Sequence, residues 1–516
     1  MSSIVETTAG KVEGFKKENL HVFLGIPFAA PPVGERRWLA PQPLEPWAGV
    51  KEAKAFVAIA PQIIAPPDPN NPLQTGFKVD TSIGEQPAAS EDCLYLNIWT
   101  PAPDNNRRPV MFWIHGGGFT GGSGASPMYN GSVYAGRGDV VVVSINYRLN
   151  VFGFLRLNEV TGGRIPSTGN EGMLDQVAAL EWVRDNIGAF GGDPDNITIF
   201  GESAGGGSVS ALMGMPAAKG LFHKVISQSG SAHFMNHSDD ADRYAEHLLG
   251  LMGISGNDSD ALQGLTMEQV LRAYVKSLNL PKGIRGPMPV VDGEIFPQQP
   301  IDSIKAGSVD GVPLMAGSNT DEWRLWQVLD PAIEGMVEGH MLARFRRMAP
   351  TWDISETIEA YREILAGRGV PVTPTEIFLA VMTARMFWIP TLKMVDAQAG
   401  RSNPAYCYLF NWGSPAKDGM FGACHAMDLG FIWNSYETAF FGPGPAADTL
   451  ARNMQDAWLA FARTGNPACE GLGKWPVCGE RRETMILGEK SGIENAPLEE
   501  ERLIWDSAPD EAFRWG

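Results

Sequence analysis

Short, largely apolar runs alternate with helical patterns along this chain. Runs that are apolar at every position, rather than at every second one, are typical of strands buried on both faces of a parallel sheet. Successive parallel strands need a crossover connection, which is usually a helix packed on the sheet. The pattern therefore predicts an α/β fold with a large, mostly parallel central sheet covered by helices. The clearest predicted strands are residues 110–114, 140–146, 197–201, 224–227, 313–316 and 405–411.

Helical spacing of apolar residues is clearest in two segments. It predicts one helix over residues 172–187 and a second over residues 450–461, after which Gly465 supplies a stop. Residues 235–275 and 327–390 also look helical and interrupt the rhythm of strands. No linker-like composition sets them apart, so we interpret them as insertions above the sheet. The length of the chain alone favours roughly three domains.

The composition limits the class of partner. Asp and Glu (59) outnumber Lys and Arg (41), and the formal net charge of −18 argues against binding to nucleic acid or to an anionic membrane surface. The N-terminal residues contain no basic region followed by an apolar one, so no secretory signal is visible. No stretch reaches the roughly 18 apolar residues of a membrane-spanning helix. We therefore expect a cytoplasmic protein, unless the N-terminus has been trimmed.

The cysteines form neither a metal-ligand spacing nor a disulfide framework. There are five of them, far apart in the sequence: Cys93, Cys407, Cys424, Cys469 and Cys478. Cys469 and Cys478 could pair across a short loop, but two free thiols are the favoured interpretation.

The motif Gly-Glu-Ser-Ala-Gly at residues 201–205 follows an apolar strand and precedes small residues that can open a helix. It fits G-x-S-x-G, and strand–turn–helix is the context that a nucleophile elbow requires. Glycines on both sides of the serine let the strand and the helix approach without Cβ clashes. A serine hydroxyl attacks only when a base removes its proton, so the motif alone leaves a plain glycine-rich turn as the alternative. We predict that Ser203 is a nucleophile.

A second glycine-rich motif follows another predicted strand. Residues 113–118 read WIHGGG, a type of segment that supplies backbone amides to the oxyanion of a tetrahedral intermediate. Gly117 and Gly118, together with the N–H of Ala204, are the predicted donors. The alternative is an ordinary glycine turn. A phosphate-binding loop is disfavoured, because the sequence has no G-x-x-x-x-G-K-[ST] motif.

The base that activates Ser203 is sought among eight histidines. In this type of fold the chain order is serine, acid, histidine. Two histidines precede the serine, four follow it too closely to leave room for the acid, and His340 lies in a basic helical pattern typical of a surface. His425 remains. The acid is expected on a loop after an intervening strand, and the segment PLMAGSNTDEW offers adjacent carboxylates at Asp321 and Glu322, which spacing alone does not separate.

Many longer segments, in one order along the chain, resemble the type-B carboxylesterases, the family of carboxylesterases, cholinesterases and bacterial para-nitrobenzyl esterases. The matching segments are LGIPFAAPPVGERRW (24–38), SEDCLYLNIWTP (90–101), WIHGGGF (113–119), INYRLNVFGFL (145–155), residues 169–206, ISQSGS (226–231), PVVDGEIFP (289–297), GSNTDEW (317–323) and FARTGNP (461–467). The resemblance implies one α/β-hydrolase domain over residues 1–516, a serine esterase activity without cofactor or metal, and small-molecule esters as substrates.

The resemblance also implies roles for single residues. The acid is then Glu322, the glutamate of the family's D-E-G motif, and Ser203 and His425 complete a catalytic triad. Gly117, Gly118 and Ala204 match the oxyanion hole. Glu202 and Ser229 match residues that buttress the histidine, and Arg37 and Glu91 match a structural ion pair.

Three departures from the family pattern are informative. The family's first disulfide would join Cys93 to a cysteine at the position of Ala60, so Cys93 is expected to be a free, buried thiol, as in a reducing compartment. Trp323 replaces the glycine of D-E-G beside the acid. Between the residues of the Arg37–Glu91 pair, the only tryptophans are two close to its start. The aromatic cation site of cholinesterases is therefore expected to be absent, and a choline ester is a poor candidate.

The substrate pocket is the least constrained part of the prediction. Residues 283–293 resemble the family's acyl-pocket loop, and their near-site positions are Arg285, Gly286, Pro287 and Met288 rather than aromatic residues. This composition predicts a roomy acyl pocket with Met288 and Trp326 on its walls, although both could equally be ordinary core residues. Residues 61–74 contain five prolines and are predicted to be an irregular surface loop, which could border a pocket.

Two alternatives to an esterase remain. A lipase or an amidase could use the same triad, and the proline-rich loop is the only visible candidate for a lipase lid. A non-catalytic adhesion or scaffolding protein of the same fold is disfavoured, because such relatives lose a triad member and this chain retains all three. We expect a monomer or a weak homodimer.

Overall fold

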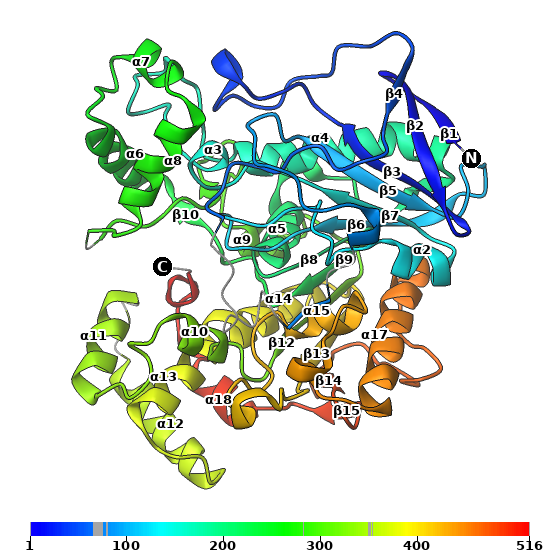
Figure 1. Ribbon diagram of the computed structural model, residues 1–516. Helices are drawn as coiled ribbons and strands as arrows, with labels where there is room; N and C mark the ends of the chain where they lie inside the picture. Colours follow the sequence, from blue (N-terminus) through cyan, green and yellow to red (C-terminus); the bar gives the residue numbers. More distant parts are fainter. Residues whose placement is uncertain are drawn as a thin grey trace.

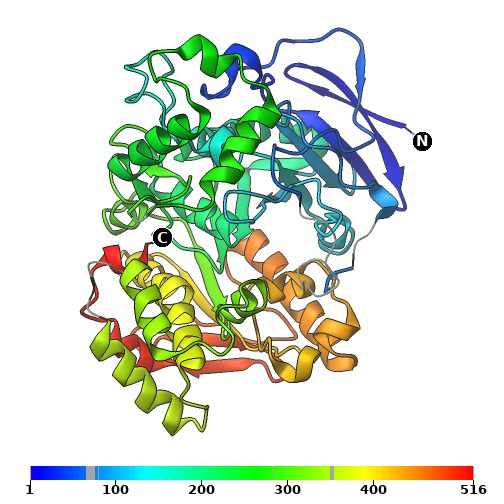
Figure 2. The same ribbon diagram turned by 60° about the vertical axis from the view of Figure 1, so that its left-hand side comes forward.

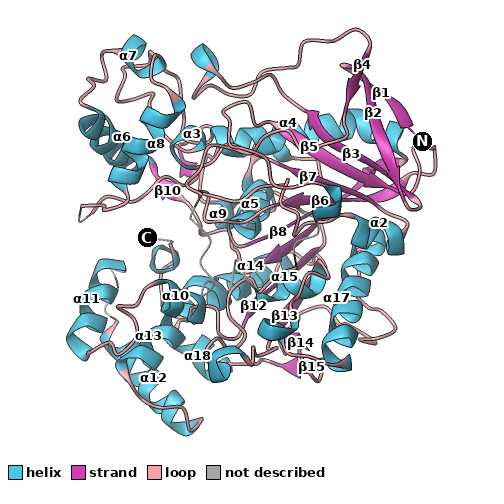
Figure 3. Ribbon diagram, viewed as in Figure 1, coloured by secondary structure: helices cyan, strands magenta, loops and turns pink. Residues whose placement is uncertain are grey.

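A long sheet with helices on both faces forms the centre of the molecule in the computed structural model (Figures 1 and 3). The structure describes residues 2–64, 76–78, 81–281, 283–348, 352 and 354–514. Within these residues thirteen strands join the sheet in the order β1-β2-β3-β5-β7-β6-β8-β9-β12-β13-β14-β15, with β4 paired to β2. All pairs between β7 and β14 are parallel, and the chain of pairs from β1 to β7 and the pair β14–β15 are antiparallel. The predicted α/β fold with a mostly parallel sheet is confirmed.

All six predicted strands are present, and they form the parallel centre of the sheet. The strands are β1 (Ser2–Thr7), β2 (Gly10–Lys17), β3 (Leu20–Pro27), β4 (Val50–Glu52), β5 (Tyr95–Thr100), β6 (Arg108–Ile114), β7 (Val141–Ile145), β8 (Gly192–Glu202), β9 (Lys224–Gln228), β12 (Leu314–Asn319), β13 (Ala405–Phe410), β14 (Glu483–Leu487) and β15 (Gly492–Asn495). The edge strands escaped prediction because they are not wholly apolar. On β2, for example, only two of the eight residues are buried.

Each central strand sends alternate side chains into one of two apolar cores. On β6, Val110, Phe112 and Ile114 belong to the first core, whereas Met111 and Trp113 belong to the second. The first core lies under α4 (Glu171–Asn186), α5 (Ala204–Gly214), α9 (Pro300–Lys305) and α14 (Ile389–Ala399). The second lies under α2 (Ser132–Gly138), α15 (Met427–Ile432) and α17 (Pro445–Thr464). Burial on both faces is what the uninterrupted apolar runs predict.

The two helices predicted from spacing are confirmed as α4 and α17. Gly465 ends α17 in the left-handed conformation, with a φ of 76°. Shorter helices complete the layers, namely α3 (Asn150–Gly153), α16 (Thr438–Phe441) and α18 (Glu499–Ile504).

The two predicted insertions are helical, and they lie on the same side of the molecule with the C-terminal segment between them (Figures 1 and 2). The first contains α6 (Ser238–Met252), α7 (Ser259–Gln263) and α8 (Met267–Ser277). The second contains α10 (Arg324–Leu329), α11 (Glu338–Met348), α12 (Ser355–Gly367) and α13 (Pro374–Thr383). A two-stranded parallel sheet of β10 (Asn236–His237) and β11 (Val290–Val291) was too short to predict.

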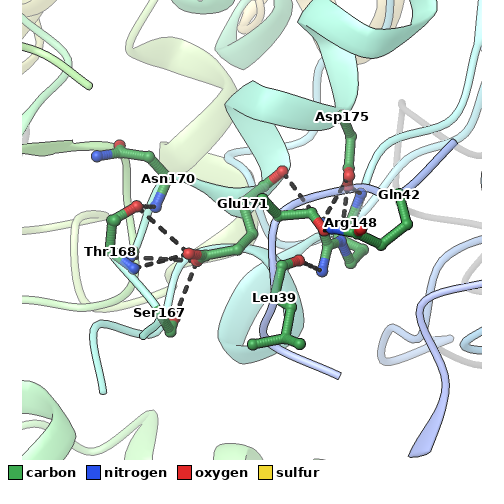
Figure 4. Close-up of polar contacts among 10 residues, drawn as sticks. Leu39, Gln42, Arg148, Ser167, Thr168, Asn170, Glu171 and Asp175 are labelled. Atoms are coloured by element: carbon green, nitrogen blue, oxygen red, sulfur yellow. Dashed lines mark hydrogen bonds and ion pairs between the residues drawn. The ribbon is translucent and has the colours of Figure 1, made fainter. Parts of the chain in front are cut away.

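A buried polar network fixes the segment that follows β7 (Figure 4). Arg148 donates through Nε and Nη2 to the two carboxylate oxygens of Asp175 on α4, at 2.8 and 2.7 Å, and through Nη1 to the carbonyl of Leu39 at 2.7 Å. Glu171, at the start of α4, accepts a hydrogen bond of 3.0 Å from the hydroxyl of Ser167. Because Arg148 is paired with Asp175 and the buried carboxyl group of Glu171 is hydrogen-bonded, the network holds the loops around α4 in one arrangement.

One expectation about apolar runs is corrected by the structure. Pro374–Ala399 is a continuous helical run, formed by α13, a π-helical turn at Ala384–Trp388 and α14. By length and composition alone it could cross a membrane, but 89% of its most apolar window is buried inside the protein, which is typical of a core helix. Polar residues interrupt this run, so it contains no unbroken apolar stretch even though its mean hydropathy is high.

All five cysteines are free thiols, as favoured for Cys469 and Cys478. Cys93 is fully buried, and its burial raises the pKa of the thiol. The loop predicted at residues 61–74 lies outside the described residues from position 65 onward.

Candidate active site

Ser203 stands between β8 and α5 in a sharply turned backbone. Its φ of 59° and ψ of −122° are rare for a residue with a side chain, so the turn stores strain. Two backbone hydrogen bonds hold it. The N–H of Ser203 donates to the carbonyl of Gln228 on β9 at 2.9 Å, and the N–H of Gly207 donates to the carbonyl of Ser203 at 2.8 Å. The strand–turn–helix arrangement expected around GESAG is therefore present.

Close approach of backbones explains why glycines flank this turn. A Cβ on Gly205 would lie against the carbonyl oxygen of Ile114 on β6, far inside van der Waals contact. A Cβ on Gly201 would lie 2.5 Å from the carbonyl carbon of Gly205. The start of α5 can therefore press onto the ends of β6 and β8 only because both positions lack a side chain.

A continuous hydrogen-bonded chain joins three of the predicted site residues. Oγ of Ser203 lies 2.8 Å from Nε2 of His425, and Nδ1 of His425 lies 2.6 Å from Oε2 of Glu322. All three side chains are buried. A carboxylate can only accept, so Nδ1 of the neutral imidazole carries the proton and Nε2 is left to accept the proton of the serine.

Glu322, rather than Asp321, meets the histidine. Oε1 of Glu322 also accepts from the hydroxyl of Ser229 at 2.6 Å and from the N–H of Asn319 at 2.7 Å. Asp321 instead accepts through Oδ2 from the backbone N–H of Ala423 at 3.1 Å, in the loop that leads to the histidine. The structure thus shows which of the two adjacent carboxylates contacts His425, a choice that sequence spacing could not make.

The predicted oxyanion donors lie around the same turn. Gly117 and Gly118 have φ values of 112° and 63°, which favour glycine. A Cβ on Gly116 would lie 2.6 Å from the carbonyl oxygen of Glu202, so the glycine loop packs directly against the serine turn. Among the described residues, the backbone N–H groups of Gly117, Gly118 and Ala204 have no protein acceptor. Unpaired donors beside Ser203 are the groups that an oxyanion developing there would require.

A second carboxyl group, that of Glu202, lies beside the histidine. Its Oε1 is buried 3.2 Å from Nε2 of His425. Burial raises the pKa of Glu202 to about 8, because its charged form loses hydration. Burial alone would lower the pKa of His425, but the negative charges of Glu202 and Glu322 outweigh it and raise that pKa above 6.5. Glu202 and His425 therefore titrate as a coupled pair.

Aromatic rings cover the imidazole on another side. The ring centroid of Trp326 lies 5.0 Å from that of His425, and the ring of Phe387 lies 4.8 Å from it. Trp326 was a predicted wall residue. Phe387 escaped sequence reasoning, because it belongs to the π-helical turn before α14 and no motif marks it. The feature that marks this position is the π-helical turn, which is often found at functional sites and is visible only in the structure.

Comparison with known proteins identifies the chain. The sequence model of the carboxylesterase family matches residues 1–505. The chain belongs to the carboxylesterase family. This carboxylesterase is 37% identical to para-nitrobenzyl esterase of Bacillus subtilis over 97% of both chains, and 34% identical to carboxylesterase 1C of Rattus norvegicus over 97% of this chain and 92% of the relative.

Solved structures agree with the family assignment. A carboxylesterase of Geobacillus stearothermophilus, 40% identical, superposes with a TM-score of 0.86 and covers 98% of this chain and 100% of its own. A PNB esterase, 36% identical, superposes with a TM-score of 0.79 over the same shares of the two chains. The carboxylesterase therefore has the α/β-hydrolase fold and is a carboxylic ester hydrolase.

The departures from the family pattern can now be located in this carboxylesterase. Trp323, in place of glycine, stacks on Trp326 with ring centroids 4.3 Å apart and an interplanar angle of 17°. The substitution therefore adds bulk to the aromatic wall beside the histidine. The expected ion pair of Arg37 with Glu91 is present, with two contacts of 2.6 Å.

Met288 occupies a less informative position in the carboxylesterase. It is buried in the first apolar core, the same core that contains Trp323 and Phe387 and against which the partly buried Trp326 packs. Its role as a wall of the acyl pocket stays a prediction.

Proposed function

We propose that this carboxylesterase hydrolyses small-molecule esters in two acyl-transfer steps, with Ser203 as the nucleophile, His425 as the general base and acid, and Glu322 as the residue that orients and stabilises His425. The observation that carries the proposal is the hydrogen-bonded chain from Oγ of Ser203 through both nitrogens of His425 to Oε2 of Glu322.

In the first step, Oγ of Ser203 attacks the ester carbonyl carbon while Nε2 of His425 takes the hydroxyl proton. The negative charge that develops on the carbonyl oxygen meets the backbone N–H groups of Gly117, Gly118 and Ala204. The tetrahedral intermediate collapses, the bond to the alcohol oxygen breaks, and Nε2 returns the proton to the leaving alcohol. The acyl group is then bound to Ser203.

In the second step, a water molecule gives a proton to Nε2 of His425 and attacks the acyl carbon. The second tetrahedral intermediate uses the same amide donors, and its collapse releases the carboxylic acid as Oγ of Ser203 takes back the proton. Glu322 remains ionised throughout, since its role is to hold the imidazole tautomer and to stabilise the imidazolium that forms in each step.

The test of this proposal is Ser203→Ala with p-nitrophenyl acetate as substrate. Loss of the nucleophile of such a triad lowers kcat by about 10⁶-fold in a comparable serine hydrolase, so we expect activity near the background rate. Ser210→Ala is the matched control. Ser210 is a buried serine two turns further along α5 that donates to the carbonyl of Gly206. The hydroxyl of Ser210 also lies 3.0 Å from that of Ser227. We expect the control to keep kcat within about tenfold, because both contacts are neutral, each costs about 1 kcal/mol to lose, and neither involves His425. Turnover by Ser203→Ala near that of the wild type would overturn the assignment.

The substrate class is proposed from the relatives and from the aromatic wall. The Bacillus subtilis relative is named for para-nitrobenzyl esters, and Trp323, Trp326 and Phe387 provide apolar surface beside His425. We expect neutral aryl and benzyl esters to be the best substrates. A panel that varies acyl and alcohol size separately, with an amide and a long-chain triglyceride included, tests this. A triglyceride emulsion cleaved faster than every soluble ester would favour a lipase instead.

A further inference from the structure

Gln228, the last residue of β9, contacts both halves of the site without touching the reacting atoms. Its backbone carbonyl accepts the N–H of Ser203 at 2.9 Å. Its side-chain Nε2 donates to Oδ2 of Asp428 at 2.7 Å. Asp428 lies three residues after His425, in the first turn of α15. One side chain and one carbonyl of the same residue therefore connect the serine turn to the histidine turn.

Both of these turns are strained. Ser203 has a φ of 59°, and Ala426, directly after His425, has a φ of 66°. Residues with a Cβ adopt such angles only when their surroundings enforce them. Ser229, the neighbour of Gln228, shares the left-handed conformation with a φ of 47° and donates to Glu322. The end of β9 thus anchors each of the three turns that carry the site.

Asp428 is a buried carboxyl group that the two-step mechanism does not use. It is fully buried, and Oδ2 accepts from Gln228 and, at 3.4 Å, from the hydroxyl of Tyr408, while the side chain of Asn319 also favours its ionised form. Gln228 is itself held, because its Oε1 accepts from Nε1 of Trp458 on α17 at 3.1 Å. Oriented in this way, the amide can only present its N–H₂ group to the carboxylate.

We propose that Gln228 and Asp428 form a positioning pair, which joins the turn of Ser203 to the turn of His425 and holds a third negative charge near the imidazole. The inference rests on the proposed triad and adds to it a reason why the imidazolium is stabilised. Two donors to the same oxygen favour the ionised form of Asp428 over the protonated one. The ionised form in turn favours the protonated form of His425.

Charged and titratable groups face Asp428 from several elements. These are Glu202 at the end of β8, Glu322 after β12, His425 on the preceding loop, Tyr408 on β13 and Tyr134 on α2. The pKa of Asp428 is raised to about 6, mainly by burial and also by the negative charge of Glu322. The hydrogen bond from Gln228 and the charge of His425 act in the opposite direction. The negative charge of Asp428 is one of the influences that raise the pKa of His425. The ionised form of Asp428 therefore favours the protonated form of the histidine.

The test is the pH dependence of kcat/KM for p-nitrophenyl acetate in Asp428→Asn, which keeps the shape and removes the charge. The acidic limb reports the protonation of His425 in the free enzyme. Removing a negative charge lowers the pKa of His425, so we expect the limb to move to lower pH by about half a unit or more. Asp428→Glu, which restores the charge, is expected to return the limb toward its wild-type position. A purely structural role would lower kcat/KM equally at all pH values.

Gln228→Met and its control distinguish loss of the hydrogen bond between Gln228 and Asp428 from a general loss of packing. Without its donor, Asp428 is harder to ionise, so the limb is expected to move in the same direction, and the double variant with Asp428→Asn is expected to move no further than Asp428→Asn alone. Gln455→Met is the matched control. Gln455 is a buried residue of α17 that donates to the carbonyl of Phe431 on α15, the helix that also carries Asp428, and it makes no hydrogen bond to Asp428 itself.

Two outcomes would overturn the positioning pair. One is an acidic limb in Asp428→Asn that coincides with that of the wild type, and the other is an equal shift in Gln455→Met and Gln228→Met. If Gln228→Met does not fold, as judged by thermal denaturation, the two Asp428 variants decide the question. Failure of the triad itself would be recognised separately, because Ser203→Ala would then remain active.

Discussion

The substitution Glu322→Gln changes one oxygen to an amino group at constant shape, and its consequence can be worked out from three hydrogen bonds. Glu322 accepts from Nδ1 of His425 at 2.6 Å, from the hydroxyl of Ser229 at 2.6 Å and from the N–H of Asn319 at 2.7 Å. An amide offers one accepting end and one donating end. If the oxygen stays toward His425, the amino group faces the N–H of Asn319, and two donors oppose each other in a buried site.

If the amide turns the other way, its amino group faces Nδ1 of His425. The imidazole must then carry its proton on Nε2, the atom that has to accept the proton of Ser203. In a chymotrypsin-type enzyme, the corresponding carboxylate-to-amide change fixes this wrong tautomer and lowers kcat about 10⁴-fold, which corresponds to about 5.4 kcal/mol of transition-state stabilisation. We expect a loss of the same order here.

Asp321→Asn is the matched comparison, since it makes the same change on the adjacent residue. The amide oxygen can still accept from the N–H of Ala423, and the side chain does not touch the imidazole. We expect kcat/KM for p-nitrophenyl acetate, measured between pH 6 and 9, to stay within about tenfold of the wild type, because only part of one hydrogen-bond network is lost. A larger loss in Asp321→Asn than in Glu322→Gln would refute the assignment of the acid.

Two further variants follow from the geometry. Gly205→Ala places a Cβ against the carbonyl oxygen of Ile114, so we expect a clearly lower melting temperature and little soluble protein, whereas an unchanged melting temperature would mean that α5 can shift freely on the sheet. Glu202→Gln removes a charge that raises the pKa of His425, so the acidic limb of kcat/KM is expected to move to lower pH. A limb that stays in place or moves to higher pH would show that Glu202 is uncharged in the free enzyme.

The parallel centre of the fold was predictable because its physical signal is local. Strands such as β6 to β9 are buried on both faces, so their central residues are largely apolar. Helices α4 and α17 have apolar residues at helical spacing. The antiparallel strands β1 and β2 at the edge have one solvated face and weaker signals. The two-residue strands β10 and β11 have none, because their pairing depends on contacts between segments more than fifty residues apart.

The candidate site was predictable to the extent that chain order reflects geometry. The order of Ser203, an acid and His425 could be read from motifs, but the choice between Asp321 and Glu322 could not. Adjacent residues on one turn point in different directions, and the direction is fixed by Asn319, Ser229 and the loop before His425.

The surroundings of the site carry no sequence signature. Phe387 reaches His425 from a π-helical turn, and Asp428 contacts Gln228 across 200 positions of sequence. Such contacts result from the packing of distant elements, so periodicity and spacing do not record them. The resemblance to a family supplies motif residues, but a buried carboxyl group that acts through a neighbouring charge belongs to no motif.

The central claim is that Ser203 forms a covalent bond with the acyl group, and mass spectrometry of the intact protein tests it most directly. After incubation with a p-nitrophenyl phosphonate ester, which transfers its phosphonyl group to an activated serine and releases p-nitrophenol, we expect a single adduct of the phosphonyl mass, one equivalent of p-nitrophenol, and total loss of activity. Peptide mapping is expected to locate the adduct on Ser203, and Ser203→Ala is expected to remain unmodified. An adduct on another residue together with loss of activity, or an active enzyme that carries the adduct on Ser203, would contradict the account.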